Sequence, residues 1–113
     1  MKKKIVKVPI PYNEIMFVIG GTANDFLEAF NQWSKDEEID GTEEVNYEKE
    51  GWTICGKKSG LIGIWLEKPE NSVLVHESVH AANYILKSAG IESDRENDEM
   101  CAYLTEYIFN KLT

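Results

Sequence analysis

The two histidines of this chain lie four residues apart, in the run His76-Glu77-Ser78-Val79-His80. In an α-helix, residues i and i+4 lie one above the other on one face, so both imidazoles would point the same way. Two such imidazoles can occupy two corners of a tetrahedral zinc ion, and the glutamate between them can act as general base on a zinc-bound water. The pattern therefore predicts a helix here, with a zinc site on it.

The residues around the histidines predict the extent of this helix. Apolar residues recur at helical spacing over residues 73–89, Asn71 or Ser72 can cap the N-terminal end, and Gly90 follows the C-terminal end. The apolar stripe expected next to the histidines is Val75, Val79, Ala82 and Leu86. The alternative interpretation is that both histidines are ordinary polar residues of a surface helix.

A last helix is predicted over residues 93–111, after a short loop. Ser93 and Glu96 have the spacing of a capping box at its start. The residues expected to face the core are Met100, Leu104 and Ile108.

A catalytic zinc ion takes three protein donors plus water, and the histidines supply only two. Glu99 is a candidate for the third ligand, because two antiparallel helices joined by a short loop would bring it back beside the histidines. Glu99 shares a helical face with Tyr103 and Glu106. The spacing alone leaves other donors open, namely Asp94, Glu96, Asp98 and Cys101. The alternative for Glu99 itself is a solvent-facing charge.

The first half of the chain predicts strands around one helix. Thr22 offers an N-cap, with Asp25 three residues on, for a helix over residues 23–35. The acidic stretch 36–44 is expected to be a solvated loop. The predicted strands are residues 3–10, 14–19, 45–47, 52–56 and 61–66.

Together these elements predict a single α+β domain over residues 1–113. We expect a small, twisted, mostly antiparallel sheet packed against the first helix and the histidine-bearing helix. The last helix, which carries the expected third ligand, would lie behind them. The tryptophans Trp33, Trp52 and Trp65 are expected in the core, with a wall of the cleft as the alternative for Trp65.

The composition excludes several classes of partner. The formal net charge of −8 should repel nucleic acid and anionic membranes, and the run Lys2-Lys3-Lys4 is too short to reverse that. No stretch resembles a signal peptide or is long enough to span a membrane. Cys55 and Cys101 form no recognisable disulfide framework. We therefore expect reduced thiols and a cytoplasmic protein.

The run 76–82 (His-Glu-Ser-Val-His-Ala-Ala), followed by 97–99 (Asn-Asp-Glu) and 102–104 (Ala-Tyr-Leu), resembles the gluzincin metallopeptidases typified by thermolysin. In that family the third zinc ligand is a glutamate on the next helix. The chain also resembles the minimal gluzincins in its size, and it is similar to small zincin-like proteins of tailed phages. The likeness covers residues 61–113.

The resemblance implies roles for four residues. His76, His80 and Glu99 would bind Zn²⁺, and Glu77 would be the general base. The strand at residues 61–66 would rim the cleft, and an extended peptide substrate would add to it as a further strand.

The chain departs from the family at two points. The family usually has an aspartate four residues after the glutamate ligand, where this chain has Tyr103. Full-size members also supply an oxyanion donor from a downstream subdomain, and this sequence stops soon after Glu99. Zinc, or a local tyrosine such as Tyr84, Tyr103 or Tyr107, would have to take that role.

The function we expect is that of a small zinc-dependent metallopeptidase, which hydrolyses peptide bonds in a bacterial or phage-infected cell. The alternative is a non-catalytic, zinc-stabilised binding protein, for example a phage factor that acts on a host protein. An acidic mimic of nucleic acid ranks third, because the charges are spread along the chain. The sequence indicates neither the physiological substrate nor the oligomeric state.

Overall fold

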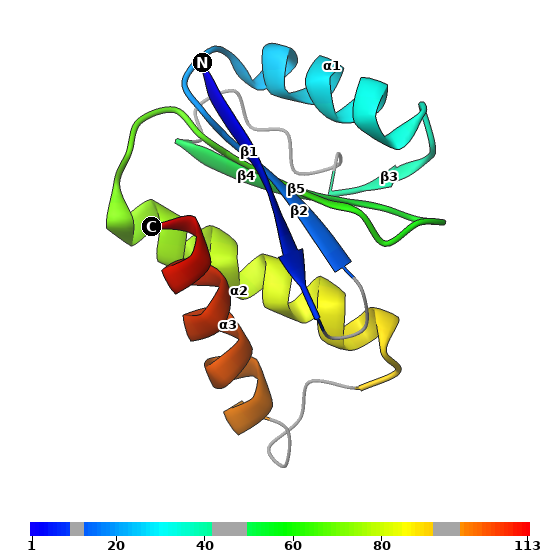
Figure 1. Cartoon of the computed structure of the whole chain (residues 1–113), viewed down its shortest axis with the longest axis vertical. Coiled ribbons are helices and arrows are strands. Elements are labelled where there is room, and N and C mark those ends of the chain that lie inside the picture. Colours follow the sequence, from blue (N-terminus) through cyan, green and yellow to red (C-terminus); the bar gives the residue numbers. More distant parts are fainter. Residues whose placement is uncertain (10–12, 42–49, 92–97) are drawn as a thin grey trace.

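The structure is a computed structural model that describes residues 1–9, 13–41, 50–91 and 98–113. A five-stranded sheet forms the middle layer, with helix α1 on one face and helices α2 and α3 on the other (Figure 1). The elements are β1 (Lys2–Val8), β2 (Asn13–Ile19), α1 (Ala23–Ser34), β3 (Ile39–Asp40), β4 (Gly51–Gly56), β5 (Ile62–Leu66), α2 (Asn71–Ser88) and α3 (Asp98–Leu112). This arrangement confirms the predicted α+β class.

The sheet has the order β1-β2-β5-β4-β3. Its middle strand, β5, runs parallel to β2 on one side and antiparallel to β4 on the other. The outer pairs, β1–β2 and β3–β4, are antiparallel as well. The sheet is therefore mostly antiparallel, as predicted, with the histidine-bearing helix under the half that contains β4 and β5.

Helix α1 begins where the capping residues predict. The Thr22 side chain accepts a hydrogen bond from the backbone N–H of Asp25, and the Asp25 carboxylate accepts one from the backbone N–H of Thr22. Each bond satisfies a donor that the first helical turn leaves unpaired. The buried face of α1 packs Phe26 and Phe30 against Trp52 and Trp65 of the sheet.

A second core lies on the opposite face of the sheet, under α2 and α3. It contains Phe17, Ile64, Ile85, Ile108 and other apolar side chains. Val75 and Val79 were predicted to lie in the apolar stripe of α2. That prediction is wrong, because they are 43% and 38% exposed. The buried face instead contains Leu74, Ser78, Ala81 and Ile85. Each of these residues precedes a residue of the predicted stripe by one position, so the buried face is rotated about the helix axis. Met100, predicted in the core, is also 43% exposed.

The C-terminal end of α2 matches the prediction, and its N-terminal cap does not. Gly90 has a φ of +77° and donates its backbone N–H to the Lys87 carbonyl, so it ends the helix as expected. The N-cap residue is Glu70, whose side chain makes no capping bond, so the predicted cap by Asn71 or Ser72 is wrong. Both are already part of the helix.

Two further expectations concern the segments between elements. The acidic stretch 36–44 contains the short strand β3, so it is not a loop throughout. The predicted strand at 45–47 and the capping box of Ser93 and Glu96 lie outside the described residues. Within the described part of the chain, no helix has the length and apolar character needed to cross a membrane.

Candidate metal and catalytic site

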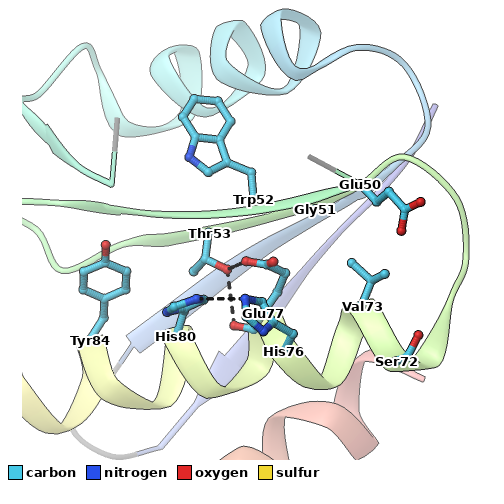
Figure 2. Close-up of a pocket in the computed structure, with 10 residues that line it drawn as sticks. All are labelled: Glu50, Gly51, Trp52, Thr53, Ser72, Val73, His76, Glu77, His80 and Tyr84. Atoms are coloured by element: carbon cyan, nitrogen blue, oxygen red, sulfur yellow. Dashed lines mark hydrogen bonds between the residues drawn. The ribbon is translucent and has the colours of Figure 1, made fainter. Parts of the chain in front are cut away.

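Both histidines lie on the exposed side of α2, and their rings converge (Figure 2). The Nε2 atoms of His76 and His80 are 3.2 Å apart. Two nitrogen donors bound to one tetrahedral zinc ion lie about 3.3 Å from each other, because each bond is about 2.0–2.1 Å long. The separation of the two nitrogens therefore matches that of two zinc ligands. The same distance also fits a hydrogen bond between one protonated and one unprotonated imidazole nitrogen.

Glu77 points from α2 toward strand β4 and is only 6% exposed (Figure 2). Its Oε1 accepts a hydrogen bond of 2.7 Å from the hydroxyl of Thr53. The Thr53 oxygen also lies 3.2 Å from the backbone carbonyl oxygen of Glu77. A hydroxyl has only one proton to donate, and the shorter contact, to the carboxylate, is the stronger one. Thr53 thus fixes the orientation of the acidic side chain next to the histidine pair.

Gly51 allows α2 and β4 to approach each other at this point. A Cβ atom there would lie 2.6 Å from Cγ1 of Val73 and 3.1 Å from the Oε2 atom of Glu77. The first distance is a clash, since non-bonded carbon atoms are most stable at about 3.5–4.0 Å. The absence of a side chain at Gly51 therefore leaves room for the carboxylate.

A cavity of about 490 Å³ opens along the seam between β4 and α2. Trp52 lines it from β4, but the indole of Trp52 points to the α1 side of the sheet and donates its N–H to the carbonyl of Gly41, at 2.9 Å (Figure 2). The lining residues are Glu50, Gly51, Trp52, Thr53, Ser72, Val73, His76, Glu77, His80 and Tyr84 (Figure 2).

The strand beside this cavity is β4, whereas the family resemblance implied that the strand at residues 61–66 would rim the cleft. That prediction is wrong, because β5 lies in the middle of the sheet and uses its backbone groups in two ladders. A strand paired on both sides offers no edge to an extended peptide. Gly51, Trp52 and Thr53 line the cavity instead.

The structure does not bring Glu99 into a metal-binding group with the histidine pair. The buried face of α3 consists of Leu104, Ile108 and Leu112, and Glu99 lies on the exposed, opposite side. Tyr103, on that same outer side, is 68% exposed. Within the described residues, no three His, Cys, Asp or Glu side chains gather as a metal-binding group.

Two other residues of the cavity, Glu50 and Thr53, were missed from the sequence. Among the described residues, Glu50 is the acidic side chain that lines the cavity besides Glu77. Tyr84 lines it too, unlike Tyr103 and Tyr107, so of the three tyrosines considered it is the one at the site. One feature of the sequence could have pointed to Thr53. It is a residue with a hydroxyl group between two large apolar residues of a predicted strand, Trp52 and Ile54.

The two cysteines are free thiols, as expected. Burial, together with the nearby charges of Asp40 and Glu37, raises the pKa of Cys55 to about 11. Cys55 is therefore a neutral thiol at physiological pH, which is a poor metal ligand. The Sγ of Cys101 lies 3.5 Å from Oδ1 of Asn83, so Cys101 faces α2.

Comparison of the chain with protein-family models, with curated proteins and with solved structures finds no match.

Proposed function

We propose that the protein is a small zinc-dependent hydrolase that cleaves peptide bonds in the cavity between β4 and α2. The observation that carries the proposal is the distance of 3.2 Å between the Nε2 atoms of His76 and His80, with Glu77 beside them. A zinc ion there would act as a Lewis acid on the scissile carbonyl and lower the pKa of a water molecule.

The residues of the chain would divide the remaining work between them. Glu77 would accept a proton from the attacking water and later pass it to the leaving amine. Thr53 would hold the Glu77 carboxylate in place during both transfers. Tyr84, which lines the same cavity, would donate a hydrogen bond to the developing oxyanion in place of Tyr103.

The third zinc ligand is proposed to be a carboxylate. Glu99 remains the candidate from the sequence. For Glu99 to bind zinc together with the histidines, the outer side of the first turn of α3 would have to face them. Glu50 is the competing candidate, because it already lines the cavity. Zinc titration of Glu99→Gln and Glu50→Gln separates them, because only loss of the true ligand should lower the affinity for the metal markedly.

A second function is favoured by one specific observation, the exposed position of Glu99 and Tyr103 on the outer side of α3. If the two histidines are the only donors that the described residues bring together, the site would hold zinc without completing a catalytic set. The protein would then be a zinc-stabilised binding protein that acts by occupying a partner. In that case Glu77 would contribute to folding, through Thr53, and not to turnover.

The test is cleavage of a broad peptide library by zinc-loaded protein, with wild type beside Glu77→Gln. The hydrolase proposal expects the variant to lose about two to four orders of magnitude in rate while it still binds zinc. Glu106→Gln, an equivalent change at an exposed residue of α3, is the matched control and should retain the full rate. Equal rates for wild type and Glu77→Gln would contradict the proposal and favour the binding protein.

A further inference from the structure

A row of lysines runs along β1, the strand at one edge of the sheet (Figure 1). Lys2, Lys3, Lys4 and Lys7 make up four of its seven residues, and the strand contains no acidic residue. The whole chain has a formal net charge of −8. Positive charge is thus concentrated on one edge of an acidic molecule.

The outer backbone groups of this strand are accessible. β1 pairs with β2 along its whole length, and no strand of the described residues lies on its other side. Residues 2–5 are all exposed, and the side chain of Ile5 contributes a large apolar surface, 45% exposed. An open edge of this kind is a template for a further strand, because its unpaired N–H and C=O groups can form a ladder with it.

A cavity of about 630 Å³ adjoins the same edge. Lys2, Lys3 and Lys4 line it together with the apolar Phe17, Ile19 and Leu112, and no Asp or Glu does. The Lys4 ammonium donates to the carbonyl of Lys111 at 3.3 Å, so it is held against α3. No ion pair joins Lys2, Lys3 or Lys7 to any described residue. These three charges are available to a partner.

We propose that β1 is a docking edge for an acidic, extended segment of a partner protein, which adds to the sheet as a further strand. Side chains alternate between the two faces along a strand, so Lys2 and Lys4 lie on one face and Lys3 and Lys7 on the other. A partner strand with carboxylates on both faces can place an opposite charge beside each lysine.

Two other partners fit these lysines less well. A flat anionic membrane would meet the lysines of one face only. A second copy of β1 would bring lysines against lysines, and like charges directly opposite each other destabilise a strand pair. Edge lysines do discourage self-pairing of sheets, and the same charges that repel another β1 attract an acidic strand.

The test uses a fluorescent nine-residue peptide with the repeat Glu-Glu-Thr-Thr, which places Glu on both faces of an added strand. Its binding is followed by anisotropy at low salt. We expect saturable binding, with slower hydrogen exchange at the outward-facing amides of β1. The triple variant Lys2→Glu, Lys3→Glu, Lys7→Glu should weaken binding at least about ten-fold, since three cross-strand charge pairs become repulsive. The triple variant Lys35→Glu, Lys58→Glu, Lys68→Glu makes the same change in net charge at exposed sites outside β1 and should bind much more tightly than the β1 variant.

A second peptide separates strand addition from general attraction between charges. It carries N-methyl groups at alternate residues, so it keeps its charge but cannot donate hydrogen bonds to the edge. We expect it to bind at least about ten-fold more weakly than the parent peptide. Equal binding of both peptides, equal effects of both triple variants, or binding to phosphatidylserine vesicles without binding to the peptide would each overturn the proposal. None of these readouts depends on zinc or on peptide cleavage.

Discussion

The hydroxyl of Thr53 donates a hydrogen bond of 2.7 Å to the carboxylate of Glu77, and it joins the middle of β4 to the histidine-bearing helix α2. Both side chains are at least nine-tenths buried, with relative exposures of 6% each. A buried carboxylate is costly unless it is hydrogen-bonded. The bond therefore lets an acidic residue face the sheet in the middle of α2.

Replacing Thr53 with Val should remove this bond while it keeps the shape of the side chain. We expect the free energy of unfolding to fall by about 1–3 kcal/mol, because Glu77 stays buried without its donor. Thr53→Ser keeps the hydroxyl and should recover most of the loss. Urea denaturation of the three proteins measures this. A Thr53→Val protein as stable as wild type would show that the hydrogen bond contributes nothing to stability.

Gly51 should tolerate no side chain. Gly51→Ala places a methyl group 2.6 Å from Cγ1 of Val73, and such overpacking costs about 1–3 kcal/mol. Val73→Ala removes the atom that clashes, so the double variant should lose less stability than the sum of the two single variants. A thermal denaturation cycle of the four proteins gives the coupling. Simple additivity would mean that the contact between Gly51 and Val73 does not limit the packing.

Zinc should stabilise the wild-type protein against heat, since a ligand that binds the folded state alone raises the melting temperature. His76→Ala and His80→Ala should each abolish most of that increase. Neither should unfold the metal-free protein, because both side chains are exposed. Scanning calorimetry with and without zinc is the measurement. An unchanged increase in either variant would remove that histidine from the proposed site.

Cys55 should make the protein less stable in alkali. Its pKa rises from 9.0 in the unfolded chain to about 11 in the folded one, so above pH 9 the unfolded state loses its proton first. The contribution of Cys55 to stability is therefore complete below pH 9 and is lost as the pH rises toward 11. Wild type should lose stability relative to Cys55→Ala across that window. Urea midpoints of both proteins from pH 8 to 11 test it, and parallel curves would contradict the raised pKa.

The parts of this protein that the sequence determined are those that depend on neighbours along the chain. The Thr22–Asp25 capping box, the end of α2 at Gly90 and the convergence of His76 and His80 all arise from residues within about one helical turn. Such contacts are set by backbone geometry once a helix forms. Hydrophobic patterning likewise predicted α1, α2, β2, β4 and β5 to within two residues at each end, and the mostly antiparallel α+β class with them.

Tertiary structure decided which segments meet. Thr53 and Glu77 are far apart in sequence, and only the packing of α2 under β4 brings them together. The order of the strands put β5 in the middle of the sheet and β4 beside the cavity, which no local pattern encodes. The packing of α3 buried Leu104 and Ile108, as predicted, but left Met100 exposed and Glu99 on the outside. Helical spacing specifies which residues share a face, but the free energy of burying one apolar face over another, summed over the whole core, decides where that face points.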